Sequence, residues 1–290
     1  MTTRLLFVHT LSPLHAGTGQ GVGVIDLPIA REKATGLPYL PGSSLKGVLR
    51  DQCDNKTTQK HLFGPEGENA SEHAGSMQFS DQRLLLLPVR SLAGTFAWVT
   101  SPFVLNRLVR DLKHAGRNGF PSRVPTVAKL EEGVIAQDAQ TLLVEKGIYL
   151  EDLDLTPKPD ADAKKWAEWI GQQVFSDPDE ANWRTMLTER LCIVHDDILS
   201  FLLETATEVT ARIKLDDDKK TVTQGALWYE EALPAETILS GVVVATPTKE
   251  IERTIKAPEL FIDLNRLIVS PLQFGGKATV GRGLCRVHLS

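Results

Sequence analysis

The residues that could do chemistry gather near the N-terminus, around a glycine-rich segment. Glycine occupies every second position from Gly17 through Gly19 to residue 23. A backbone without side chains can approach a ligand closely and can adopt positive φ angles. The polar side chains of His15 and Asp26 flank this segment on either side. We therefore expect it to form a ligand-binding loop.

A short helix that could hold a phosphate follows this loop. Ser43 and Ser44 come directly after Pro-Gly and predict a turn with a hydroxyl N-cap, so that the helix covers about residues 44–53. Lys46 and Arg50 are four residues apart and share one helical face near the N-terminus. Free N–H groups at that end favour an anion. The same spacing also fits a solvated surface helix, and both readings stay open at this point.

Two nucleotide-binding motifs are excluded. A dinucleotide-binding fold needs a helix directly after its glycine loop, but residues 22–28 continue as an extended segment. The second glycine-rich segment reads Gly275-Gly276-Lys277-Ala278 and lacks both the leading glycine spacing and the Ser or Thr of a phosphate-binding P-loop.

Length and composition indicate a soluble intracellular protein. The chain has 290 residues and is 42% hydrophobic, enough to bury a core. Its three cysteines are far apart and show no metal spacing, which favours a reduced, cytoplasmic protein. The N-terminus lacks the apolar region of a signal peptide, and no run reaches membrane-spanning length. We expect no contact with a membrane.

Charge is unevenly distributed along the chain. The net charge is −5, but residues 1–64 and residues 249–290 each carry +3, which leaves −11 for the middle. Both basic ends contain a glycine-rich segment. If these ends are adjacent in space, they form a local positive groove on an otherwise acidic protein.

The pattern of elements predicts an α+β fold. Strands are expected over 4–11, 77–89, 95–100, 236–246 and 284–289, helices over 44–53, 101–112, 164–174, 180–191 and 258–269, and loops over 116–125 and 155–163. Trp166, Trp169 and Trp183 are expected to be packing anchors. The outer elements follow the order β-α-β … β-α-β, which indicates a ferredoxin-like, RRM-type core. The base-stacking aromatics of an ordinary RRM are missing.

A β-hairpin is predicted in the second half of the chain. Thr and Val alternate over 208–215 and 221–229, on either side of a charged tip, Asp216–Lys220.

Several motifs resemble those of a known family. They are His15-Ala-Gly-Thr-Gly19, residues 24–31, 35–47, 62–64, 77–81 and 227–234, and the terminal run 274–283. In this order, over nearly the whole chain, they resemble the RAMP superfamily of CRISPR proteins, and more closely the backbone subunit of the type III-B Cmr effector complex.

The resemblance implies a modified ferredoxin-like palm, a β-hairpin thumb and a helical insertion within a single RAMP domain, 1–290. The core would cover about 1–110 and 236–290, the insertion 111–207 and the thumb 208–229. Several copies would stack along a CRISPR RNA together with other subunits of the Cmr complex. Each thumb would displace a nucleotide of the guide–target duplex, and each copy would cut the single-stranded target RNA there.

The resemblance also implies roles for individual residues. Asp26 corresponds to the aspartate that the family needs for cleavage, and His15 to its accompanying histidine. A further acid corresponds to Glu230 or Glu231, and the choice between them stays open. The residues implied to bind RNA are Gly17, Gly19, Ser43, Ser44, Lys46, Arg50, Gly275, Gly276, Lys277, Gly281, Arg282 and Gly283.

These residue types suit RNA cleavage. RNA carries its own nucleophile, the 2′-OH, so a nuclease mainly needs in-line geometry, a base or metal, and charge stabilisation. Asp26 could bind a divalent cation, Mg²⁺ or Mn²⁺, or orient the hydroxyl directly. The chain has no His-Glu-x-x-His or Cys-x-x-Cys motif for zinc. The alternatives are a purely architectural RNA-binding RAMP subunit and a stand-alone CRISPR-RNA processing enzyme.

Overall fold

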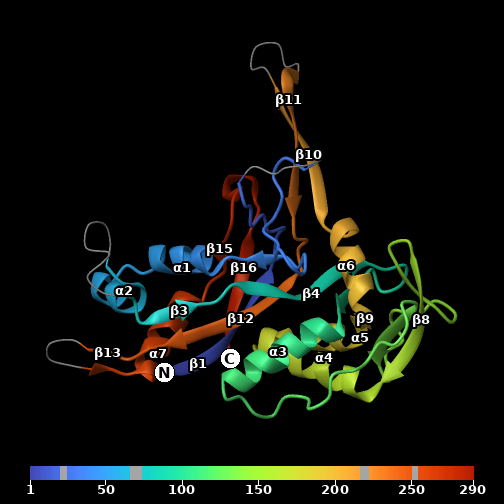
Figure 1. Ribbon diagram of the computed structural model, residues 1–290, viewed down its shortest axis with the longest axis horizontal. Coiled ribbons are helices and arrows are strands. Elements are labelled where there is room, and N and C mark those ends of the chain that lie inside the picture. The colour runs from blue at the N-terminus through green and yellow to red at the C-terminus, as the bar shows by residue number, and fades with distance from the viewer. Residues whose placement is uncertain (20–24, 66–73, 216–221, 250–253) are drawn as a thin grey trace.

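Strands from both ends and from the middle of the chain join one large mixed sheet (Figure 1). The computed structural model describes residues 1–19, 25–65, 74–215, 222–249 and 254–290. In that part of the chain the sheet has twelve strands. They are β1 (Thr2–Thr10), β2 (Tyr39–Leu40), β3 (Met77–Phe79), β4 (Gln82–Arg90), β5 (Phe96–Thr100), β6 (Glu132–Ala136), β7 (Ile148–Leu150), β8 (Leu153–Asp160), β9 (Leu191–Val194), β12 (Ile238–Ala245), β15 (Leu272–Gln273) and β16 (Leu284–Leu289).

Four antiparallel strands form the part of the sheet that carries the site. Their order is β16-β1-β12-β4, with β1 paired to both β16 and β12. Helices α1 (Gly42–Asp51) and α2 (Lys56–Phe63) connect β1 to β4, and α7 (Ala257–Leu267) connects β12 to β16. Leu5, Leu6, Phe7 and Val8 follow one another in β1 and are all buried. Since successive side chains of a strand point to opposite faces, both faces of β1 are covered.

The segment 111–207, expected as a helical insertion, supplies strands as well as helices. It begins within α3 (Pro102–His114) and holds α4 (Ala161–Val174), α5 (Ala181–Arg190) and α6 (Asp196–Thr205). Strand β9 runs parallel to β5 and carries β6, β8 and β7 onto the same sheet. All four residues of β9 are apolar and buried. Such a continuous apolar segment fits a strand in the interior of a sheet that is covered on both faces. The loop expected over 155–163 was wrong, since β8 and the start of α4 occupy it.

The tryptophans pack the helices of this segment against the sheet, as the sequence predicts. Trp166 is fully buried, and its Nε1 donates to the carbonyl of Arg123 at 2.8 Å. Trp169 and Trp183 are half-buried against the core. Trp183 also stacks on Phe175 with ring centroids 5.7 Å apart. One apolar core therefore runs through the strands β16-β1-β12-β4 and the added segment.

Helix α1 begins earlier than the sequence predicts, and no serine caps it. Its N-cap is Pro41, and no side chain of the cap residue bonds the helix. Instead Asp81, between β3 and β4, accepts a hydrogen bond of 2.9 Å from the N–H of Gly42. Ser43 and Ser44 lie within the first turn. The expected hydroxyl N-cap was wrong because a carboxylate from a neighbouring segment takes its place.

The predicted hairpin is present and projects from the sheet (Figure 1). It consists of β10 (Glu208–Leu215), which follows α6, and β11 (Val222–Ala232). Its expected tip, 216–220, lies outside the described residues. A second, smaller ribbon pairs β13 (Thr248–Lys249) with β14 (Thr254–Ile255), and two 3₁₀ turns are η2 (Pro178–Glu180) and η3 (Ala278–Val280). No helix in the described ranges has the length and apolar character needed to cross a bilayer.

Candidate functional site

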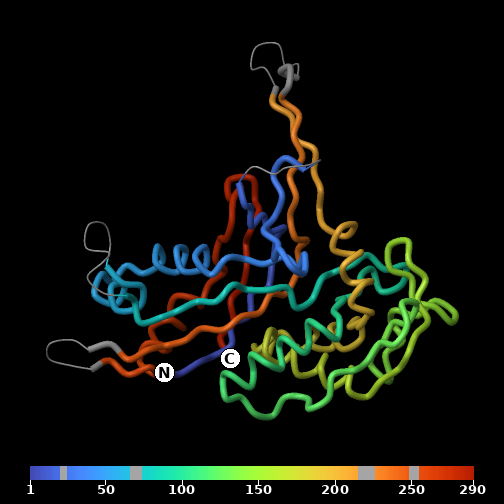
Figure 2. Tube along the Cα trace, viewed as in Figure 1, coloured from blue at the N-terminus to red at the C-terminus, as the bar shows by residue number. Residues whose placement is uncertain are grey.

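Three segments meet at the foot of the hairpin. They are the loop after β1, the end of β11, and the second glycine-rich loop between β15 and β16 (Figure 2). Leu14 pairs with Leu233, the residue directly after β11, through two backbone hydrogen bonds. The N–H of Gly276 donates to the carbonyl of His15 at 3.0 Å. The fold thus brings both glycine-rich segments, from opposite ends of the chain, to one place.

Asp26 is an exposed carboxylate held by backbone contacts. Its Oδ2 accepts a hydrogen bond of 2.8 Å from the N–H of Tyr229, in β11. The next residue, Leu27, donates to the carbonyl of Tyr229 at 3.1 Å and accepts from the N–H of Glu231 at 3.0 Å. The loop therefore runs along the strand as a short parallel ladder. This ladder fixes the carboxylate while leaving it open to solvent.

His15 is buried and oriented by a single strong contact. Its Nδ1 lies 2.6 Å from the carbonyl oxygen of Glu231. A carbonyl oxygen only accepts hydrogen bonds, so Nδ1 carries the proton and Nε2 of the neutral ring is an acceptor. A Cβ at Gly17 would lie 2.6 Å from this Nε2. Gly17 thus leaves room for the imidazole ring, a role that the sequence alone did not indicate.

Glu231, one of the two candidate acids, faces the Asp26 loop. Its carboxylate is almost completely buried and accepts from the N–H of Ile29 at 3.0 Å and from Arg31 Nη2 at 2.5 Å. Glu231 therefore joins the hairpin to the loop that carries Asp26.

Glu230, the other candidate acid, faces the second glycine-rich loop. Its Oε1 lies 2.8 Å from Lys277 Nζ and accepts from Trp228 Nε1 at 2.8 Å, and Arg212 is 3.4 Å from Oε2. Burial by itself would raise the pKa of Glu230, but the hydrogen bonds from Lys277 and Trp228 and the charges of Lys277 and Arg212 outweigh it and lower the pKa to about 2. Glu230 is hence ionised at neutral pH and does not act as a general acid.

The second glycine-rich loop is shaped by chain packing. Gly275 and Gly283 have φ angles of +73° and +79°, and a Cβ on them would collide with the carbonyl groups of His15 and Phe274. Gly281 also has positive φ, +80°, where open space surrounds it. Arg282 is almost completely buried and donates to Thr210 Oγ1 at 3.3 Å. Both cations predicted to hold phosphates, Lys277 and Arg282, thus contact the hairpin.

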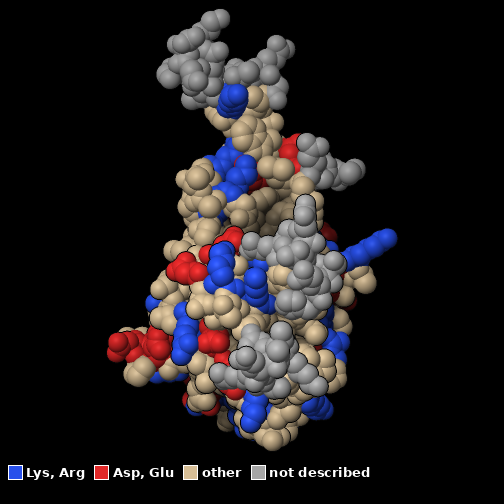
Figure 3. All heavy atoms as spheres, turned by 90° about the vertical axis from the view of Figure 1, so that its left-hand side faces the viewer, with Lys and Arg blue, Asp and Glu red and all other residues tan. Residues whose placement is uncertain are grey.

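The cations predicted on the first helix lie elsewhere. Ser43, Lys46 and Arg50 line a hollow of about 570 Å³ between α1, the end of α2 and β3. Arg50 Nη1 donates to the carbonyl of Gly64 at 2.8 Å, which closes one side of the hollow. Figure 3 shows the face of the molecule at the α1 and α2 end, where Lys and Arg side chains are interspersed with fewer acids. Phosphate binding by these residues stays a prediction.

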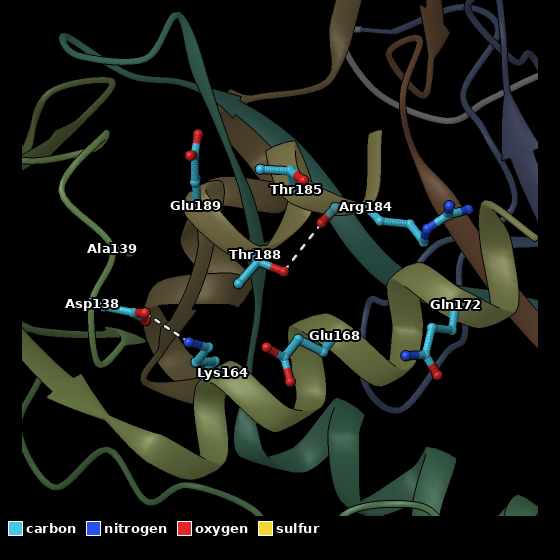
Figure 4. Close-up of a pocket in the computed structure, with 9 residues that line it drawn as sticks. All are labelled: Asp138, Ala139, Lys164, Glu168, Gln172, Arg184, Thr185, Thr188 and Glu189. Atoms are coloured by element: carbon cyan, nitrogen blue, oxygen red, sulfur yellow. Dashed lines mark hydrogen bonds and ion pairs between the residues drawn. The ribbon is translucent and has the colours of Figure 1, made fainter. Parts of the chain in front are cut away.

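A second hollow, of about 490 Å³, lies between α4 and α5 (Figure 4). Its cations are already engaged. Lys164 pairs with Asp138 at 2.6 Å, and Arg184 donates to the carbonyl groups of Phe175 and Asp177. Thr188 turns its hydroxyl onto its own helix. Both cations of this hollow are therefore paired within the chain.

The carboxylates at the hairpin foot do not form a metal centre by themselves. Within the described ranges no group of three or more His, Cys, Asp or Glu side chains could hold a metal ion. Glu230 and Glu231 are paired with cations, which leaves Asp26 as the carboxylate with an exposed edge. A Mg²⁺ ion there would need water and ligand oxygens to complete its six positions.

Three residues of the site were not predicted as site residues. Arg31, Arg212 and Trp228 hold the two acids in place. Arg31 and Trp228 fall within motifs that carried the resemblance. No spacing rule links Arg31 to Glu231, 200 residues away, whereas Trp228 lies only two residues before Glu230 on the same strand.

The chain is similar to proteins of one family. A family model described as the RAMP superfamily matches residues 7–286. Over 296 residues the chain is 36% identical to the CRISPR system Cmr endoribonuclease Cmr4 of Pyrococcus furiosus, covering 100% of this chain and 96% of that protein.

Solved structures agree with this match. The crystal structure of oligomeric Cmr4 from Pyrococcus furiosus has a TM-score of 0.77 and 29% identity, covering 100% of this chain and 98% of that one. A chain in the cryo-EM structure of the type III-B Cmr-beta bound to cognate target RNA has a TM-score of 0.75, with 100% and 97% covered. Its identity is 23%, so that likeness bears on the fold alone.

Proposed function

Since the chain belongs to the RAMP superfamily, in the family of the Cmr4 subunits, we propose that it is the backbone subunit of a type III-B Cmr effector complex. In this role it binds CRISPR RNA and cleaves complementary single-stranded target RNA. Its partners are further copies of itself and the other Cmr subunits. The observation that carries the proposal is the exposed Asp26 carboxylate at the foot of the hairpin, in a chain 36% identical to a protein named as an endoribonuclease.

The cleavage step uses the 2′-OH of the target as nucleophile. Its oxygen attacks the adjacent phosphorus, its proton leaves to a base, and the 5′-oxygen departs and takes up a proton. Asp26 is the group placed to orient or deprotonate the hydroxyl, because its carboxylate is exposed and fixed. His15 offers Nε2 as a second acceptor. Glu230 and Glu231 position these segments through ion pairs.

A divalent cation, Mg²⁺ or Mn²⁺, remains part of the proposal. Asp26 is the residue that would bind it, with the remaining ligands from water and RNA phosphate oxygens. When bound, such an ion would supply stabilisation of the developing negative charge.

We further propose that the strands β16-β1-β12-β4 form a ferredoxin-like palm and that the hairpin is a thumb. The support is the strand order 4-1-3-2, all antiparallel, with helices between the first and second and between the third and fourth strands. The projection of the hairpin from the sheet supports the thumb. A cytoplasmic location fits the three cysteines, all free and buried.

The test is cleavage of a guide-complementary RNA by the assembled complex. We expect cut products with Mg²⁺ and none with EDTA. If cleavage persists in EDTA, Asp26 acts without a metal. If the complex binds its target and cuts it under neither condition, the subunit is architectural and the proposed activity is wrong.

A further inference from the structure

We propose that Arg31 is a positioning residue for cleavage, which holds the Asp26 loop against the hairpin by neutralising the buried carboxylate of Glu231. This inference rests on the proposed endoribonuclease function. It assigns a role to a residue that contacts neither Asp26 nor His15.

The guanidinium of Arg31 joins segments that are far apart in the sequence. Its Nη2 donates to Glu231 Oε1 at 2.5 Å and to the carbonyl of Leu203 at 2.8 Å. Its Nη1 donates to the carbonyl of Gly36 at 3.1 Å. One side chain therefore connects the Asp26 loop, the foot of the hairpin and the end of α6, the helix that leads into the hairpin.

Glu231 depends on this cation. Its side chain is only 4% exposed, so its charge is poorly solvated by water. A buried carboxylate that loses its partner is strongly unfavourable, because the desolvation that the ion pair offset is no longer balanced. Without Arg31 the Glu231 side chain would turn toward water, and this movement breaks its hydrogen bond from the N–H of Ile29.

That hydrogen bond is the last contact of the ladder that positions Asp26. The ladder begins with the N–H of Tyr229 on Asp26, continues through both backbone bonds of Leu27, and ends with the N–H of Ile29 on Glu231. Ile29 lies only three residues after Asp26 in the sequence. Loss of the hydrogen bond at Ile29 therefore loosens the ladder close to the Asp26 carboxylate. A shift of about 1 Å at a reacting group can reduce a rate on the order of 100-fold.

The carbonyl of Glu231 also orients His15 Nδ1. The same residue of the hairpin thus holds both expected catalytic groups, one through its side chain and one through its backbone. Arg31 acts on the side-chain half of this arrangement.

A matched control lies one residue further along the loop. Glu32 forms a bidentate ion pair with Arg107 of α3, at 2.7 and 2.5 Å. Arg107→Gln removes an ion pair of the same loop without touching Glu231. If the loop merely needs tethering, the two variants behave alike. If Arg31 acts through Glu231, they differ.

The experiment measures single-turnover cleavage and target affinity in the complete complex, for wild type, Asp26→Asn, Arg31→Gln, Arg31→Lys and Arg107→Gln. We expect Arg31→Gln to lower the cleavage rate between about tenfold and 100-fold, with target affinity within about twofold of wild type. Arg31→Lys should recover part of the rate, because it restores the charge but not the planar fork. Arg107→Gln should cleave at the wild-type rate.

A double-mutant cycle tests the route of the effect. Arg31→Gln with Glu231→Gln should be no slower than the slower single variant, since both changes remove one interaction. The inference is overturned if the rate reductions of the two single variants multiply in the double variant. It is also overturned if Arg31→Gln cleaves at the wild-type rate, or if Arg107→Gln loses as much rate as Arg31→Gln. A complex of wild-type subunits that does not cleave overturns the proposed function instead. Thermal melting of each variant distinguishes a misfolded subunit from one in which only the Asp26 loop is misplaced. If Arg31→Gln does not fold, Arg31→Lys is used in its place.

Discussion

Glu230 and Glu231 are neighbours on one strand and have different partners. Because adjacent side chains of a strand point to opposite sides, Glu230 meets Lys277 of the second glycine-rich loop and Glu231 meets Arg31 of the Asp26 loop. The hairpin foot is thus fastened on both sides by an ion pair. The sequence could identify the acidic pair through its motif, but the choice between the two acids depends on contacts with other segments, such as that of Glu231 with Arg31, 200 residues away.

The low pKa of Glu230 predicts a pH-dependent contribution to stability. Its folded pKa of about 2 lies below the ordinary 4.5, so the ionised form stabilises the folded chain above pH 4.5. This contribution is lost as the pH falls from about 4.5 toward 2. At pH 7, Glu230→Gln should lower the free energy of unfolding by about 1–3 kcal/mol.

Urea unfolding of wild type and Glu230→Gln between pH 7 and pH 3 measures this difference. We expect the gap between the two proteins to narrow steadily below pH 4.5. Glu168→Gln, on the exposed side of α4, serves as the control and should show no gap. A difference between wild type and Glu230→Gln that stays constant down to pH 3 would contradict the ion-pair account.

The periodicity of apolar residues predicts helices and strands well where the local sequence alone determines the secondary structure. The hairpin strands, α3 with its Ser101 cap, α4 and α5 all lie where the pattern places them. The failures come from tertiary partners. Asp81 caps α1 from a distance, and the short run 191–194 becomes a strand because β5 and β6 flank it. No local pattern indicates such partners.

Helix α1 is predicted to bind the guide backbone through Lys46. Lys46→Ala should lower the slope of log affinity against log salt for single-stranded RNA by roughly 0.7, because one phosphate contact is lost. The loss should be equal for unrelated sequences, since phosphates carry no sequence information.

Salt titrations of the affinity for two unrelated single-stranded RNAs measure this slope. Lys165→Ala on α4 is the control. A change in sequence preference with no change in salt slope would exclude this role for Lys46.

The hairpin is predicted to set the spacing of the cuts. An isolated two-stranded ribbon is marginally stable, and side chains of this one are exposed on one face, among them Val209, Ile213 and Leu227. Replacing residues 215–221 with a short glycine linker should leave the melting temperature of the subunit within a few degrees, because the described hairpin residues next to this segment, 208–214 and 226–231, contribute nothing to the apolar core.

The same variant should abolish regular product spacing on a long target RNA. Replacing residues 250–253 in the same way is the control and should leave the spacing intact. Cuts at unchanged periodic positions in the shortened protein would show that another part of the protomer sets the interval.

At the scale of the molecule, the two basic ends of the chain do meet, as the charge distribution allows. β1 pairs with β16, and the two glycine-rich loops touch at His15 and Gly276. The cations of the second loop, however, contact the hairpin, and Lys277 pairs with Glu230. The shared surface thus has an ion-paired base, with Asp26 exposed at its edge. The sequence showed what would follow if these loops were adjacent, but neither that they meet nor which charges would be neutralised there.

The central claim is that Asp26 carries the cleavage of target RNA. The most direct measurement is the single-turnover cleavage rate of Asp26→Asn in a complex that also contains guide RNA, with target affinity measured on the same preparation. Asn keeps the size of the side chain and an oxygen that can accept from Tyr229, but it removes the charge. The account predicts a rate at least on the order of 100-fold below wild type, with unchanged assembly and target affinity. Cleavage by Asp26→Asn at the wild-type rate would contradict it.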